Sequence, residues 1–186
     1  MGTSRDELMQ LLSHQPNEPS LAQRIKDVEA EQPADLTRDV DALEGVWELR
    51  WSSSSQPWLK QGPWIDNLQI LDPANRRGCN ILTLRGPLGS LGGISVEATL
   101  NLVNSTRVEV TFQRGGWVGP RGRGAPGWKL MRDVQQSFPA WLDITVVDDQ
   151  LRICRGNAGT TFALLRRKDK QLSEFFDIAQ FSMSSQ

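Results

Sequence analysis

The sequence is poor in the residues that carry most catalytic and metal chemistry, with one histidine, two cysteines and no tyrosine in 186 residues. Two thiols are too few for a cysteine-rich zinc site or a disulfide framework, so we expect no metal, no cofactor and a reducing compartment. No apolar run approaches the length of a membrane-spanning helix. The first residues lack the basic start and apolar core of a signal peptide, and we expect a cytoplasmic protein.

Two features stand out against this scarcity. The chain has seven tryptophans, and its net charge of −1 hides a division. Residues 1–45 hold 4 basic and 10 acidic residues (net −6), whereas residues 46–186 hold 17 and 12 (net +5). A hydrophobic content of 38% is typical of a globular chain, so we expect one folded domain with an appendage.

The pattern of residues 1–42 predicts an acidic arm of two short helices. Ser4 and Glu7 have the spacing of a capping box, and leucines follow on one helical face. A second helix is predicted to start at Ser20 and to end at Pro33. Helices this short are marginal alone, so we expect them to pack on something larger.

From residue 43 the apolar period changes from 3.6 to 2, which is typical of strands with one buried face. Turn residues interrupt the alternation. We therefore predict a mainly β fold, an antiparallel barrel of about eight strands in residues 43–168, followed by a tail of residues 169–186. The expected strands are 46–51, 65–71, 79–84, 94–102, 107–112, 142–147, 151–154 and 160–166.

Residues 114–127 hold six glycines and two prolines, which predicts a loop on the barrel rim; Leu130, Val134 and Phe138 then have helical spacing. Residues 122–127 match G-x-G-x-x-G, but the flanking β pattern is not the βαβ unit that a dinucleotide site needs. A nucleic-acid site would need a broader basic face, so we expect no nucleic acid. Two alternatives are kept for this loop: it contacts membrane headgroups, or it contacts a protein partner. Its residues are Arg114, Trp117, Arg121, Arg123 and Trp128.

Catalytic chemistry has little support in the sequence. His14 lies in the acidic arm, and neither Cys79 nor Cys154 has a histidine nearby in sequence to activate it, so we expect a surface imidazole and two buried structural thiols. Asp148 and Asp149 are adjacent, and neighbouring residues of a hairpin point to opposite sides, which argues against a paired acid and base. We predict that the protein is not an enzyme.

The opening of the predicted barrel, Gly45-Val46-Trp47, resembles the first lipocalin motif. In lipocalins this tryptophan closes the base of the barrel, and an arginine of the last strand packs across its ring. Arg166 or Arg167 stands at the corresponding place in chain order, and Arg166 is our choice. The alternative is an ordinary core tryptophan. The resemblance implies a barrel closed by Gly45, Trp47 and Arg166.

Longer stretches resemble the plastid lipid-associated protein (PAP)/fibrillin family. Residues 43–53 are similar to its opening motif L-x-G-x-W-x-L-x-Y-T-S, with Trp51 in place of the tyrosine. Residues 141–159 are similar to its C-terminal motif, which ends in L-R-I-x-R-G-x-x-G before an apolar strand. Shorter similar blocks lie between them, and the resemblance covers about residues 20–167.

The resemblance implies a lipocalin-like protein that binds lipids, quinones or carotenoids, in thylakoid membrane maintenance or photoprotection. It also implies a cyanobacterial-type member without a transit peptide, cytoplasmic or peripheral on thylakoid membranes. The acidic family position associated with ligand contact corresponds to Asp148. The other residues expected to line the pocket are Trp51, Ile94, Val96, Ala98, Val108, Val110, Phe112 and Ile144.

Two other functions stay open. In the first, the barrel is packed solid, and the acidic arm or the basic loop docks on a membrane or on a protein partner, steered by the division of charge. In the second, a calycin-type barrel handles a bilin, which needs an acidic or nucleophilic group in its pocket. The expected partners are thus a hydrophobic small molecule or lipid, a membrane surface or another protein.

Overall fold

The computed structural model describes residues 3–56, 64–85, 92–119, 129–136 and 139–176. Four short helical elements precede the first strand: α1 (Ser4–His14), α2 (Leu21–Glu31), α3 (Leu36–Asp39) and the 3-10 helix η1 (Val40–Leu43). The strands are β1 (Gly45–Ser52), β2 (Ile65–Asp72), β3 (Arg77–Leu84), β4 (Gly93–Leu102), β5 (Arg107–Val118), β6 (Lys129–Asp133), β7 (Ala140–Val147), β8 (Leu151–Gly156) and β9 (Thr161–Arg166), with a last 3-10 turn η4 (Leu172–Glu174).

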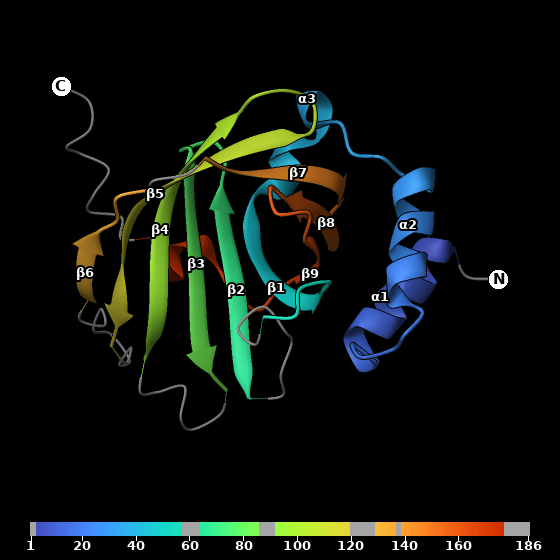
Figure 1. The fold of residues 1–186 in the computed structure, drawn as a ribbon, viewed down its shortest axis with the longest axis horizontal. Coiled ribbons are helices and arrows are strands. Elements are labelled where there is room, and N and C mark those ends of the chain that lie inside the picture. The colour runs from blue at the N-terminus through green and yellow to red at the C-terminus, as the bar shows by residue number, and fades with distance from the viewer. Residues whose placement is uncertain (1–2, 57–63, 86–91, 120–128, 137–138, 177–186) are drawn as a thin grey trace.

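The described strands form one antiparallel sheet in the order β4-β3-β2-β1-β9-β8-β7-β5-β6, and a further pairing of β4 with β5 closes a ring. β5 makes this closure possible. Along one edge it pairs with β4, and along the other it pairs first with β7 through residues 107–110 and then with β6 through residues 114–118. The predicted mainly β, barrel-like fold is confirmed (Figure 1).

The two ends of the barrel differ. At one end, which we call the closed end, α3 and η1 lie next to the start of β1; it is uppermost in Figure 1. Leu36 of α3 and Leu43 of η1 are buried in the inner core together with Trp47 of β1. At the opposite end, which we call the open end because no described helix covers it, β3 ends and β2 and β4 begin (Figure 1). Among the described helices, α3 and η1 therefore cover the closed end of the barrel, and none covers the open end.

The helices α1 and α2 lie beside the barrel and cover the outer face of β7–β9 and β1 (Figure 1). Leu8 and Leu12 of α1 and Ile25 of α2 are buried in one cluster with Leu151 and Ile153 of β8. Because helices of this length gain little from their own backbone bonds, the shared apolar cluster stabilises them, as the sequence predicts. Among the described residues, no helix is long and apolar enough to cross a membrane.

The first helix is capped one residue earlier than predicted. Thr3 is the N-cap: its Oγ1 accepts a hydrogen bond from the Asp6 amide at 3.2 Å, and the Asp6 carboxylate accepts one from the Thr3 amide at 3.3 Å. Ser4 donates instead to Glu31 of α2 at 2.8 Å. Threonine with aspartate and serine with glutamate fit the same capping pattern, so spacing alone does not distinguish two adjacent frames.

The glycine-rich stretch corrects a second prediction. Residues 114–118, expected in a loop, continue β5, and residues 129–133, expected to be helical, form β6. Gly116 permits this pairing because a Cβ there would collide with the Leu130 carbonyl oxygen. Glycines that indicate a loop in the sequence serve here for close approach of two strands, and β6 is the strand that the alternation did not predict.

Two register shifts change which face the side chains occupy. In β1 the pairing with β9 shifts between Leu49 and Trp51, so Leu49 faces the interior with Trp47 while Trp51 packs outside against the α1–α2 cluster. In β7 a shift between Ile144 and Val146 has the same effect. The prediction that Trp51 lines the pocket is therefore wrong, because the bulge reverses its side.

Candidate functional site

The closed end is built around Trp47, whose side chain is fully buried. Its Nε1 donates a hydrogen bond to the Leu43 carbonyl oxygen of η1 at 2.9 Å. The guanidinium of Arg166 lies 4.2 Å from the centroid of the Trp47 ring, which is the contact that the lipocalin resemblance implies. Arg167 points elsewhere and forms an ion pair with Glu48 at 3.2 Å. Trp47 is thus stacked, hydrogen-bonded and enclosed.

Arg166 also ties the neighbouring backbone together. Its Nε donates to the Asp149 carbonyl oxygen at 2.7 Å, its Nη2 to that of Ala42 at 2.6 Å, and its Nη1 to that of Glu44. Gly45 has a φ of +136°, and a Cβ there would collide with Arg166 Nη1, so glycine is required on both counts. These contacts fix the backbone of the closed end around Arg166.

A cavity of ≈ 400 Å³ lies inside the barrel, between Trp47 and the open end, and residues of β1–β4 and β9 line it. Its apolar wall includes Leu49, Val96 and Phe162, and the amides of Gln69 and Asn80 face it. A volume of this size, with apolar walls and a few polar groups, is typical of sites for small molecules. The cavity is therefore our candidate functional site.

Two of the predicted lining residues, Ile94 and Val96, line this cavity. Val110 faces the same interior, packed against the inner core, and Ala98 and Phe112 are directly paired across β4 and β5. The remaining two lie deeper in the inner core: Val108 and Ile144 are buried there. Val108 also lines a second cavity of ≈ 380 Å³ beside η1.

Asp148 lies in the turn between β7 and β8 at the closed end, away from the cavity. Its two carboxylate oxygens accept from Arg5 of α1, from Nε at 2.6 Å and from Nη2 at 2.9 Å. The amides of Gln150 and Leu151 donate to it as well. Burial alone would raise the pKa of Asp148, but these bonds outweigh burial and lower the pKa. Asp148 fastens α1 to this turn, and the structure does not support the ligand contact that the resemblance implies.

Exposed apolar side chains gather at the open end. Ile94, Trp117 and Leu130 are in register across β4, β5 and β6, and they are 51%, 40% and 60% exposed. Trp64, just before β2, is 74% exposed. We call these four residues the apolar rim. An exposed group of this kind is typical of a surface that meets a lipid or a partner.

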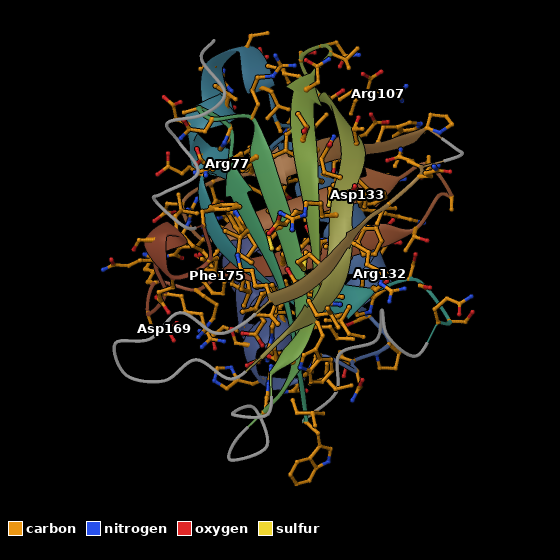
Figure 2. The ribbon with its side chains drawn as sticks, turned by 90° about the vertical axis from the view of Figure 1, so that its left-hand side faces the viewer. Arg77, Arg107, Arg132, Asp133, Asp169 and Phe175 are labelled. Carbon is orange, nitrogen blue, oxygen red and sulfur yellow. The ribbon has the colours of Figure 1, made fainter. Side chains whose placement is uncertain are left out.

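The predicted membrane or partner loop is only partly described. Trp117 belongs to the apolar rim, and Arg114 lies in register with Glu97 of β4 and Asp133 of β6, so acidic side chains flank it. Figure 2 shows Asp133 with Arg132 on β6, where this strand crosses in front of the barrel. The remaining residues of the prediction, Arg121, Arg123 and Trp128, lie outside the described residues.

The groups considered for catalysis lie apart from one another. Cys79 and Cys154 are free and buried, and burial raises the pKa of the Cys154 thiol, which opposes its activation as a nucleophile. His14 is exposed, and its Nδ1 lies 3.1 Å from the Gln10 carbonyl oxygen. Over the described ranges, histidine, cysteine and carboxylate side chains nowhere gather in threes or more as a metal site would need.

Sequence reasoning missed Arg152. This residue is fully buried on the inner face of β8, its guanidinium lies 5.1 Å from the centroid of the Trp47 ring, and its Nη2 donates to Gln69 Oε1 at the cavity. Leu151 and Ile153 carry the apolar side of this strand, but they face α1 and α2. An apolar stripe is thus a poor guide to the barrel interior where helices cover the outside.

The chain matches the PAP_fibrillin family over residues 11–123, more than half of its length. This range runs from α1 into the residues after β5 and includes the Gly45-Val46-Trp47 motif and the β1–β4 part of the cavity wall. No curated protein and no solved structure matches the chain significantly. On the family match, together with the closed barrel, the chain belongs to the PAP/fibrillin family of lipid-associated proteins.

Proposed function

We propose that this protein binds a lipid or another small hydrophobic molecule inside its barrel and acts by binding rather than by catalysis. The observation that carries the proposal is the cavity of ≈ 400 Å³ between the Trp47 end and the open end. Family membership supports an association with lipids. Burial of an apolar ligand against Leu49, Val96 and Phe162 is worth about 25 cal/mol per Å² of apolar surface removed from water.

The candidate ligands are a membrane lipid, a quinone or a carotenoid, each mostly apolar with few polar atoms. The amides of Gln69 and Asn80 at the cavity supply donors and acceptors that would orient such polar atoms. We propose that the protein is peripheral on the thylakoid membrane and acts there in membrane maintenance or photoprotection. The apolar rim supports this setting because it gives the open end a surface suited to a lipid boundary.

The test is organic extraction of the purified protein followed by mass spectrometry. We expect an apolar molecule in about equimolar amount. A matched pair of variants locates it: Val96→Arg places a charge in the cavity, whereas Val103→Arg makes the same change at an exposed site beyond β4. Val96→Arg should lose the molecule and Val103→Arg should keep it. An empty wild-type protein that also takes up no added lipid, quinone or carotenoid would contradict the proposal.

A second candidate function is docking on a membrane without an internal ligand, and the apolar rim is the observation that favours it. Flotation with anionic liposomes tests it, with Trp117→Ser/Leu130→Ser as the variant and Val103→Ser as the control at the other end of β4. If the protein floats with the liposomes while its organic extract contains no apolar molecule, docking on a membrane is favoured over binding of a ligand inside the barrel. The described lining of the cavity includes no acidic side chain and no thiol, so a bilin-handling function gains no support.

A further inference from the structure

Arg152 and Arg166 both lie against Trp47, but their N–H groups are satisfied very differently. Arg166 donates from Nε, Nη1 and Nη2 to four backbone carbonyl oxygens. Arg152 donates from Nη2 to Gln69 Oε1, while its Nε and Nη1 are buried without a hydrogen-bond partner among the described residues. Arg166 is therefore held in place by its hydrogen bonds to the backbone, whereas Arg152 has two buried donor atoms without a partner.

The surroundings of Arg152 make its lack of hydrogen-bond partners energetically unfavourable. Burial lowers the pKa of Arg152 to about 10, and the nearby positive charge of Arg166 adds to the effect. A Cys154 thiolate would stabilise the positive charge of Arg152, but burial raises the pKa of Cys154, so its thiol is neutral at physiological pH. No described salt bridge joins Arg152 to a carboxylate. A buried guanidinium without a counter-ion is unfavourable, and an anion that enters its neighbourhood removes the penalty.

The position of Arg152 connects it to the cavity. Arg152 extends from β8 across the interior, over Trp47, to Gln69 of β2, and Gln69 is itself a wall residue of the cavity. Trp47 and Arg152 do not line the cavity themselves but lie behind Gln69 in the fully buried interior, and we call these three residues the polar floor. Toward the open end the wall includes Val96, which is paired with Asn80, and reaches the half-exposed Ile94 at the apolar rim.

We propose that the cavity takes an amphiphile with one anionic head group, a carboxylate or a phosphate, bound head-inward on Arg152 and Gln69 with its apolar chain directed to the open end. The guanidinium supplies a positive charge and unsatisfied N–H donors at Nε and Nη1, and charge-assisted hydrogen bonds to the oxygens of such a head group would satisfy them. This inference rests on the proposed function and specifies the chemical class of its ligand. A neutral apolar molecule would leave the charge of Arg152 uncompensated.

The test compares three ligands with the same chain on the delipidated full-length protein: palmitate, hexadecyl phosphate and the neutral hexadecanol. Their affinities are measured by displacement of Nile red, an uncharged apolar dye. We expect at least one anionic ligand to bind about tenfold or more tightly than hexadecanol. The better of the two anions identifies the head group, and each result supports the proposal.

Variants assign the preference to Arg152. Arg152→Met should bind hexadecanol like the wild type and should lose the preference for the anion. Arg155→Met, on the same strand and paired outside with Glu29, is the matched control and should keep it. Arg152→Lys retains the charge and should keep part of the preference, which separates loss of the anion site from loss of the fold.

The outcomes separate the two proposals. Equal binding of palmitate, hexadecyl phosphate and hexadecanol by the wild type overturns head-inward anion binding and leaves the proposed function standing, and this comparison needs no variant. An anion preference that survives in a folded Arg152→Met also overturns it. If none of the three ligands displaces the dye and extraction finds no apolar molecule, the proposed function itself fails.

Discussion

At the closed end of the barrel, Trp47 is fully buried, its indole nitrogen is hydrogen-bonded to Leu43, and Arg166 lies across its ring. At the open end, Trp117 is 40% exposed and in register with the exposed side chains of Ile94 and Leu130. The same residue type thus closes one end and lines the rim of the other. The two ends differ in how completely the tryptophan ring is buried, and this difference predicts which end stabilises the fold and which end is free to bind.

The largest expected effect is at Trp47. Trp47→Ala removes the fully buried ring on which two arginines lie and should lower the free energy of unfolding by about 3–5 kcal/mol. Trp117→Ala at the open end should lower it by less than about 1 kcal/mol, because much of that side chain is already in water. Urea unfolding of both variants measures the contrast. Equal losses would remove the distinction between the ends.

Gly45→Ala should have the next largest effect, about 1–3 kcal/mol, because the φ of +136° is unfavourable for alanine and the new Cβ would displace Arg166 Nη1. Gly159 has a φ of +76° with open space around it, so Gly159→Ala carries the backbone penalty alone. Thermal unfolding of the pair isolates the contribution of the Arg166 contacts. A Gly159→Ala variant as unstable as Gly45→Ala would show that these contacts contribute nothing.

The ion pair between Asp148 and Arg5 joins α1 to the closed end, and its contribution to stability depends on pH. Because the folded-state pKa of Asp148 is lowered, its stabilising contribution is present above pH 4 and is lost as the pH falls through that lowered pKa. At pH 7, Asp148→Asn should cost about 1 kcal/mol, while Asp149→Asn, at the more exposed neighbour, should cost less. The difference between wild type and Asp148→Asn should shrink in acid; a constant difference from pH 7 to pH 2 would contradict this role.

The smallest effect on stability is expected at Arg152. Replacement of a buried, uncompensated charge by an apolar side chain is neutral or stabilising, so Arg152→Met should leave the free energy of unfolding unchanged or raise it by about 1 kcal/mol. Arg166→Met, which breaks four bonds to backbone carbonyl oxygens, should lower it clearly. Chemical denaturation of both variants decides the point. A large loss in Arg152→Met would make Arg152 structural too.

The strands could be predicted because they follow from local spacing, and the Trp47 closure because its motif resembles the first lipocalin motif. Alternation marks the pleated faces, and the Gly45-Val46-Trp47 motif identifies the residue around which the end closes. β6 escaped prediction because its partner stretch in β5 is rich in glycine, and the role of glycine there depends on the strand that approaches it.

The assignment of faces could not be predicted. One bulged residue reverses the side of Trp51, and nothing in the local pattern distinguishes a bulge from a regular strand. Arg152 was missed for a related reason. The apolar Leu151 and Ile153 are buried by α1 and α2 outside the barrel, a contact between distant segments, and the inner face of β8 therefore carries a charge. Asp148 is likewise explained by Arg5, which lies far away in the sequence.

The most direct test of the central claim, that the barrel interior is the binding site, is methyl NMR of the protein during titration with hexadecanol. The account predicts shifts at Ile94 and Val96 of the cavity and none at Ile25, which is buried among the helices outside the barrel. Shifts confined to Ile25 and its cluster, or no shifts in the cavity at saturating ligand, would contradict it.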